Sequence, residues 1–113
     1  MADDLLAVAR DRARSNRFWQ HLGIDVAEVR EGWARLRVDV RDELRNAPGA
    51  PVHGGVYAAL VDAAIGCAEG MLLRRGRTVA FGEVRVTDDA GALVAVGRAT
   101  YLILPSRARE ASG

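Results

Sequence analysis

The chain has 113 residues, of which 50% are hydrophobic and 27% are charged, and its formal net charge is +1. A chain of this length is expected to form one domain, residues 1–113, that buries roughly two thirds of the surface exposed by its unfolded form. The balanced charge disfavours both disorder and a nucleic-acid-binding surface. We therefore expect a globular domain that has no nucleic-acid partner.

Cysteine content and apolar runs limit the cellular setting. Cys67 is the single cysteine, so an internal disulfide is excluded, and we expect Cys67 to be a small core residue. The longest apolar run stops at Arg74, short of the roughly 20 residues that span a bilayer. The first residues show neither the basic segment nor the apolar segment of a secretion signal. The predicted location is the cytoplasm, with no membrane partner.

The first forty residues predict a helix followed by a hairpin. From Leu5 to Leu22 apolar residues recur at helical spacing with charges between them, so residues 1–22 are predicted to form one N-terminal helix that stops at Gly23. Residues 24–30 and 33–40 alternate between apolar and polar. Glu31-Gly32 between them is a two-residue turn signal, which predicts a β-hairpin.

The rest of the chain predicts a loop, a central helix and a second hairpin. Residues 45–51 carry two prolines and a glycine, so they form a loop before a helix expected over residues 54–73. Residues 78–87 and 92–104 have strand composition on either side of a turn at 88–91. Pro105 closes the last strand, and residues 106–113 form a flexible polar tail. The predicted class is α+β, with an antiparallel sheet wrapped around a long central helix.

The segment Val52-His53-Gly54-Gly55-Val56 is the first chemical candidate. At the start of a helix the first N–H groups have no intrahelical acceptor, and the helix dipole adds positive charge there. An ester or thioester carbonyl placed against Gly54 would be polarised by that N–H, and glycine lets a substrate approach the backbone. A flexible start of the helix that has no chemical role is the alternative.

Asp62 is the second candidate, because it interrupts an apolar helical run. It lies eight residues beyond Gly54, which corresponds to about 12 Å along an α-helix, so one carbonyl cannot meet both groups within one chain. If both act on the same carbon, Asp62 must come from a second subunit whose helix runs antiparallel across a two-fold axis. A surface acid that faces solvent or pairs with an arginine is the alternative.

Three further candidates stand beside the central helix. His53 could donate to a substrate or cap its own loop, and no second ligand stands at metal-binding spacing from it, so no metal site is predicted. Asn46 could hold a water or a thioester oxygen, or simply form a turn. The cluster Arg74, Arg75 and Arg77 could receive the phosphates of a nucleotide-bearing substrate, or could be a solvated turn.

These motifs resemble the hotdog-fold thioesterases of the phenylacetate-degradation type, a group of acyl-CoA hydrolases. The likeness lies in the Asn, the His-Gly-Gly and the helix acid at their spacing, and it extends over the final hairpin. The matching residues are Asn46, His53-Gly54-Gly55-Val56, Ala59 to Ala64, Arg75 to Val84, Asp88 to Ala95 and Ala99-Thr100-Tyr101.

The resemblance implies a hotdog fold and hydrolysis of an aromatic or medium-chain acyl-CoA to the free acid and CoA. It implies that Asp62 is the nucleophile or the general base, and that Gly54 supplies the oxyanion N–H. Asn46 would position the water or thioester, and His53 would shape the loop or bind near the thioester. Gly55, Arg75 and Arg77 would contact the substrate. CoA would belong to the substrate, so no bound cofactor is expected, and the site would be shared in a homodimer or a dimer of dimers.

The chain departs from the family after the central helix. Two central strands, roughly 25 residues with their turn, have no counterpart before the final hairpin. The rival prediction is therefore a catalytically impaired hotdog module that binds acyl-CoA or forms oligomers.

Overall fold

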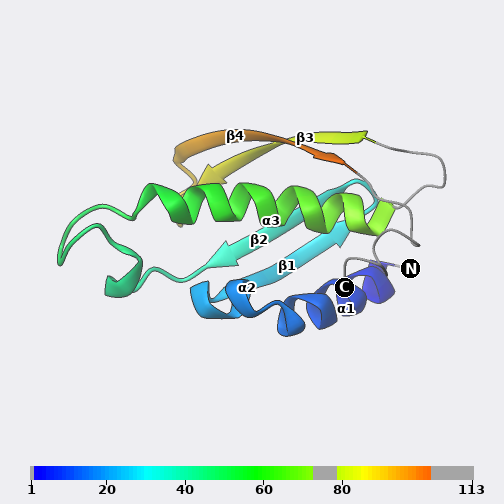
Figure 1. The fold of residues 1–113 in the computed structure, drawn as a ribbon, viewed down its shortest axis with the longest axis horizontal. Coiled ribbons are helices and arrows are strands. Elements are labelled where there is room, and N and C mark those ends of the chain that lie inside the picture. Colours follow the sequence, from blue (N-terminus) through cyan, green and yellow to red (C-terminus); the bar gives the residue numbers. More distant parts are fainter. Residues whose placement is uncertain (1, 73–78, 103–113) are drawn as a thin grey trace.

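The computed structural model describes residues 2–72 and 79–102. The elements run in the order α1 (Ala2–Ser15), α2 (Arg17–Leu22), β1 (Ile24–Arg30), β2 (Trp33–Val38), the 3-10 helix η1 (Asp42–Leu44), α3 (Gly54–Leu72), β3 (Val79–Thr87) and β4 (Leu93–Leu102). The strands pair as two antiparallel hairpins, β1 with β2 and β3 with β4. Both hairpins pack on the long helix α3, and α1 packs on β1 (Figure 1). This confirms the predicted α+β arrangement of antiparallel strands around a central helix. None of the helices in the described ranges is long and apolar enough to cross a membrane.

The prediction of one N-terminal helix over residues 1–22 is wrong, because the chain breaks between α1 and α2. Asn16 at the break has an extended backbone, and its side-chain oxygen accepts a hydrogen bond from the Trp19 N–H at 3.0 Å. An asparagine N-cap of this kind starts a new helix, so α1 ends before Asn16 and α2 begins after it. The stop at Gly23 is confirmed: its φ of 79° is left-handed, and its N–H donates to Trp19 O at 2.8 Å.

The first hairpin forms as predicted and ends slightly earlier. Gly32 has a φ of +71°, which suits the tight turn between β1 and β2. β2 ends at Val38, two residues before the predicted Val40. A register shift between Val26 and Glu28 puts Val26 and Val29 on the same buried face.

The core lies where β1, β2 and the helices meet, and it consists of two clusters. One joins α1, β1 and α3, and the other joins α2, β1, η1 and α3. Their buried members are Ala9, Ala13, Val26, Val29 and Cys67 in the first cluster, and Leu22, Ile24, Leu44, Val56 and Ala63 in the second. Val56, near the start of α3, belongs to the second cluster, so packing against α2, β1 and η1 fixes the start of this helix.

The second hairpin approaches α3 closely through two glycines. A Cβ built on Gly97 would lie 2.5 Å from Val61 Cγ2, and one built on Gly82 would lie 3.1 Å from Ile65 Cγ1. Val61 and Ile65 are one helical turn apart on α3. The two glycines therefore allow β3 and β4 to pack directly on this face of the helix.

The central helix begins at Gly54 as predicted, and its assigned end is Leu72. β3 and β4 agree with the predicted strands within the described residues. Several predictions fall outside them: the cluster Arg74, Arg75 and Arg77, the stop at Pro105, and the tail 106–113.

Candidate active site

The loop before α3 is held in a fixed shape by a short antiparallel arrangement. Arg45 and Val52 form an isolated bridge, and the His53 N–H donates to Leu44 O at 2.8 Å. At the tip, the Ala50 N–H donates to Ala47 O at 2.9 Å, and Gly49 has a φ of +74°. This is a type II turn, with Pro48 and Gly49 at its central positions. The prolines and glycine that predicted a loop thus bring His53 to the start of α3 in a defined direction.

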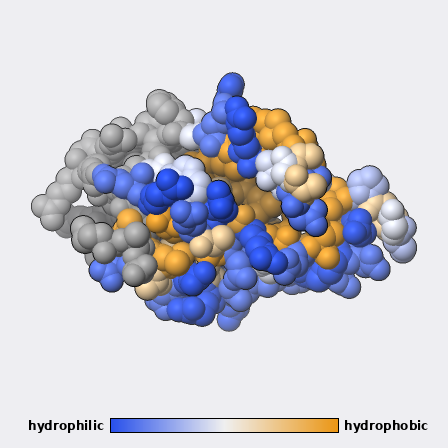
Figure 2. Space-filling model, turned by 180° about the vertical axis from the view of Figure 1, so that it is seen from behind, coloured by the Kyte–Doolittle hydropathy of each residue, from blue (hydrophilic) through white to orange (hydrophobic). Residues whose placement is uncertain are grey.

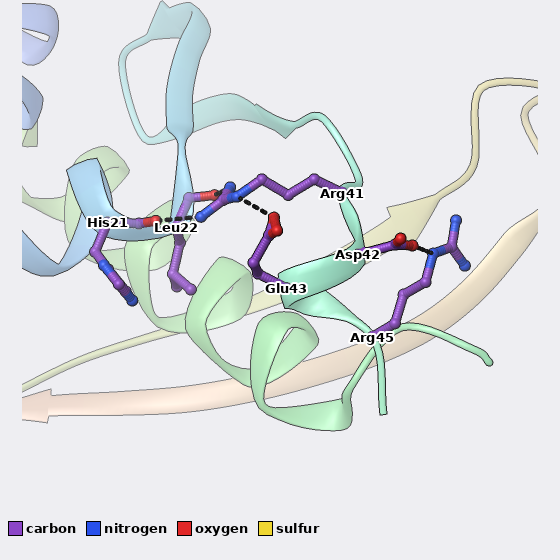
Figure 3. A network of polar contacts seen from close by, with 6 residues as sticks. All are labelled: His21, Leu22, Arg41, Asp42, Glu43 and Arg45. Carbon is purple, nitrogen blue, oxygen red and sulfur yellow. Dashed lines mark hydrogen bonds and ion pairs between the residues drawn. The ribbon is translucent and has the colours of Figure 1, made fainter. Parts of the chain in front are cut away.

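Arg41, just before η1, ties this part of the chain to α2 (Figure 3). Its Nη1 donates to Leu22 O at 3.0 Å and its Nη2 donates to His21 O, so the guanidinium caps the C-terminus of α2. Its Nε also lies 3.4 Å from Glu43 Oε1. No local sequence pattern indicates this role of Arg41, because both of its carbonyl acceptors lie about twenty residues away in the sequence.

His53 acts as the N-cap of α3. Its Nδ1 accepts a hydrogen bond from the Gly55 N–H at 2.8 Å, which fixes the neutral tautomer with the proton on Nε2. A Cβ built on Gly55 would lie 2.9 Å from this Nδ1. Of the two roles predicted for His53, the structure shows the capping role, and it shows why glycine stands at position 55.

Gly54 is different, because nothing in the described chain requires a glycine there. A Cβ built on Gly54 would meet no atom within 4 Å, and its N–H has no acceptor among the described residues. Gly54 is exposed, and the first turn of α3 contains no acidic residue. The Gly54 N–H therefore lies at the positive end of the helix dipole with open space around its α-carbon.

Asp62 lies on the exposed side of α3, although its neighbours Val61 and Ala63 are buried. The exposed side of the helix also includes Gly54 and Ala58. Eight residues of helix separate Asp62 from Gly54, which is about 12 Å. A single chain thus presents both groups on its surface but does not bring them together.

Both nitrogen donors of Asn46 form hydrogen bonds within the loop. Its backbone N–H and its side-chain Nδ2 both donate to Pro51 O, at 3.0 and 3.3 Å. The structure thus supports the turn-forming alternative for its amide nitrogen.

Cys67 is buried in the core, and burial raises the pKa of its thiol, which suits a packing role. In the described ranges no three His, Cys, Asp or Glu side chains are grouped to hold a metal ion.

Comparison with solved structures decides the fold family. A crystal structure of a protein from the thioesterase superfamily superposes with a TM-score of 0.81 and 29% sequence identity, over 89% of this chain and 99% of that chain. The chain has the hotdog fold of the thioesterase superfamily. The E. coli PaaI protein from the phenylacetic acid degradation operon has a TM-score of 0.75 at 18% identity, over 90% of this chain and 95% of that one, and shows the fold alone.

Sequence comparison adds a relative with a hydrolase name. The protein "Putative esterase VNG_1336C" of Halobacterium salinarum is 36% identical over 69 residues, which are 59% of this chain. The match spans 46% of that relative, which is about half of its length. No model of a known protein family matches the chain. Taken together, the comparisons relate the chain to proteins that are named as a thioesterase-superfamily member or an esterase.

Proposed function

We propose that the protein is an acyl-CoA thioesterase whose active site is shared by two copies of the chain. The observation that carries this proposal is Gly54: an exposed N–H at the start of α3, without an acceptor in the described chain and with no atom within 4 Å of a built Cβ. An N–H in this setting is suited to an oxyanion. The hotdog fold and the esterase-named relative support hydrolysis of a thioester.

The chemistry follows from the two groups on α3. The thioester carbonyl oxygen accepts the Gly54 N–H, which stabilises the negative charge that develops when the carbonyl carbon is attacked. The carboxylate of Asp62 either attacks that carbon itself or removes a proton from a water that attacks it. In both routes the C–S bond breaks, CoA leaves as the thiol, and water supplies the oxygen of the free acid.

A shared site follows from the separation of the two groups. Because Gly54 and Asp62 are about 12 Å apart along one helix, a single thioester carbon reaches both only when Asp62 comes from a second copy. Two α3 helices antiparallel across a two-fold axis place each Gly54 near the other copy's Asp62 and produce two equal sites. His53 contributes by capping the helix, and Asn46 by holding the loop.

The test uses a substitution that removes one donor and leaves the helix intact. Gly54 is the first residue of α3, where proline is tolerated because its missing N–H would have no intrahelical acceptor. We expect Gly54→Pro to fold normally and to lower kcat by about 10²- to 10³-fold with a panel of acyl-CoA substrates, measured by thiol release. The matched control is Gly54→Ala, which keeps the N–H. A Gly54→Pro variant as active as the wild type would contradict the oxyanion role.

Mixing two inactive variants tests the shared site. Asp62→Asn and Gly54→Pro are each expected to be inactive, whereas unfolding and refolding them together produces mixed dimers that contain one intact site. Random pairing should restore roughly a quarter of the wild-type activity. No recovery, in a mixture shown by mass to contain mixed dimers, would contradict a site shared between copies.

The split between the two hairpins supports a second candidate, an acyl-CoA-binding hotdog module without turnover. β2 and β3 do not pair with each other in the described chain, so part of the sheet over α3 is open. Saturable binding of CoA esters without thiol release by the wild type would favour this module over the enzyme.

A further inference from the structure

Arg41 holds together two parts of the chain that lie far apart in the sequence. Figure 3 shows its guanidinium between the end of α2 and the side chain of Glu43 in η1. Two donors of this one planar group bond to successive carbonyls, those of His21 and Leu22, which fixes the direction of the side chain. Arg41 is also the N-cap residue of η1. The start of η1 is therefore anchored to the end of α2.

η1 depends on this anchor because it is short. A 3-10 helix of three residues has little stability of its own. Its buried side chain is Leu44, which packs in the core cluster that contains Val56. A single packed side chain fixes where a short segment lies but leaves it free to turn about that contact. The second attachment, three residues earlier at Arg41, fixes the direction of the segment.

Hydrogen bonds carry the direction of η1 to the start of α3. The Leu44 N–H donates to Arg41 O at 2.9 Å, and Leu44 O accepts from the His53 N–H at 2.8 Å. The His53 imidazole in turn accepts the Gly55 N–H at 2.8 Å. Gly54 lies between His53 and Gly55, so the direction of its N–H depends on where His53 is held. A series of hydrogen bonds thus runs from α2 to the two residues that flank Gly54.

The loop between η1 and α3 projects from one end of the molecule (Figure 1). Contacts within this segment give it a shape: Arg45 Nη1 donates to Ala50 O at 2.9 Å, and Arg45 Nε lies 3.5 Å from Asp42 Oδ1. Such contacts do not fix the direction of the segment relative to α2. That direction is set at the base of the loop, where Arg41 lies.

Arg41 lies outside the groove that separates the two hairpins. This groove lies between β2 and β3 and has a volume of about 1130 Å³, and Figure 2 shows it from behind as a hollow with apolar surface. Arg41, His53 and Gly54 do not line it. A substitution of Arg41 therefore acts on Gly54 through the loop and leaves the lining of the groove unchanged.

We infer that Arg41 is a positioning residue of the proposed active site. By fixing the direction of η1 against α2, it holds His53 where the imidazole caps α3, and so keeps the Gly54 N–H aimed at the thioester oxygen. The inference rests on the proposed function, because it assigns Arg41 to the oxyanion donor of that site. A misplacement of about 1 Å can cost on the order of 10²-fold in rate, so loss of Arg41 should lower kcat and not raise KM.

The kinetic test compares two substitutions that weaken opposite ends of α2. Arg41→Ala removes the contacts at its C-terminus, and Asn16→Ala removes the N-cap without touching the series of bonds to Gly54. We expect Arg41→Ala to lower kcat by about 10- to 100-fold, with KM changed by less than about threefold. Asn16→Ala should leave both constants within about twofold of the wild type. Arg41→Lys should lie between, since lysine lacks the planar fork that reaches two carbonyls.

A measurement on the His53 ring does not depend on turnover. In nitrogen NMR at about pH 8, where an ordinary imidazole is neutral, a ring with its proton fixed on Nε2 gives two well-separated signals. Wild type and Asn16→Ala should show these signals, whereas Arg41→Ala should show signals drawn together by exchange between tautomers. The Gly55 amide hydrogen should also exchange with solvent about tenfold faster in Arg41→Ala than in Asn16→Ala. A His21→Gln protein identifies the signals of the other histidine.

Three results would overturn the inference while the proposed function stands. The first is unchanged ring signals and Gly55 exchange in Arg41→Ala, and the second is the same changes in Asn16→Ala. The third is a normal kcat in an Arg41→Ala protein whose ring signals have moved together, because Gly54 would then not depend on His53. Failure of the proposed function is a different result: the wild type would show no turnover, or Gly54→Pro would be fully active, and the inference would fall with it.

Discussion

Substituting Gly97 by alanine tests the close packing of the second hairpin on α3. The added Cβ would lie 2.5 Å from Val61 Cγ2 and 2.9 Å from Val61 Cγ1. Carbon atoms in good contact are about 3.5–4.0 Å apart, so either β4 retreats by about 1 Å or Val61 leaves its rotamer. Overpacking of this kind costs about 1–3 kcal/mol, while replacing glycine in a strand returns about 0.5–1 kcal/mol. We expect Gly97→Ala to lower the free energy of unfolding by about 1–2 kcal/mol.

The assay is thermal and urea unfolding followed by circular dichroism. For a domain of this size the loss corresponds to a fall in Tm of about 4–8 °C. Gly82→Ala is the matched comparison and should cost less, since its nearest contact is Ile65 Cγ1 at 3.1 Å. Adding Val61→Ala to Gly97→Ala removes the clashing methyl groups, so the two changes should compensate by about 1 kcal/mol or more in a double-mutant cycle. A Gly97→Ala protein as stable as the wild type, or changes that simply add, would refute the packing argument.

Three further predictions concern caps and the core. Gly54→Ala should be more stable to urea than Gly55→Ala by about 1 kcal/mol, because only the second displaces the His53 cap; equal stabilities would argue against that cap. Asn16→Ala should lose about 1 kcal/mol in the same assay and Asn16→Asp should not, since aspartate also caps; equal losses would show that the cap is unimportant. Burial raises the pKa of the Cys67 thiol, so as the pH rises the thiol of the unfolded chain loses its proton before that of the folded chain. The contribution of Cys67 to the free energy of unfolding is therefore intact below about pH 8.5 and declines above it. The difference in unfolding free energy between wild type and Cys67→Ala should therefore shrink from pH 7 to pH 10, and a constant difference would contradict this.

The parts of the fold that follow from local signals could be predicted. Gly32 and Gly23 sit where a left-handed backbone is needed, and their effect depends on immediate neighbours. The start of α3 at Gly54 also follows from a local signal, because the prolines and glycine of residues 45–51 end just before it. The break at Asn16 was missed because the helical spacing of apolar residues continues across it. Asparagine is a strong N-cap residue, so the signal was present but was outweighed by the pattern.

The local contacts of the candidate residues could be predicted only in part from the sequence. His53 and Gly55 act on each other, and which ring nitrogen accepts depends on how the loop aims the imidazole. The roles of Arg41 and Asn46 depend on carbonyls that tertiary folding or the loop turn brings near. The groove between β2 and β3 joins segments more than forty residues apart, and no local pattern indicates it.

The two hairpins differ in how much of the described chain supports them. β1 and β2 are covered by α1, α2 and α3, whereas β3 and β4 pack chiefly on α3. An isolated hairpin is only marginally stable in water, so the second hairpin depends on the one helix face that Gly82 and Gly97 contact. We therefore expect β3 and β4 to open in a local unfolding event of lower free energy than global unfolding, and their amide hydrogens to exchange with solvent before those of β1 and β2. Uniform exchange in both hairpins would instead show that α3 couples them into one cooperative unit.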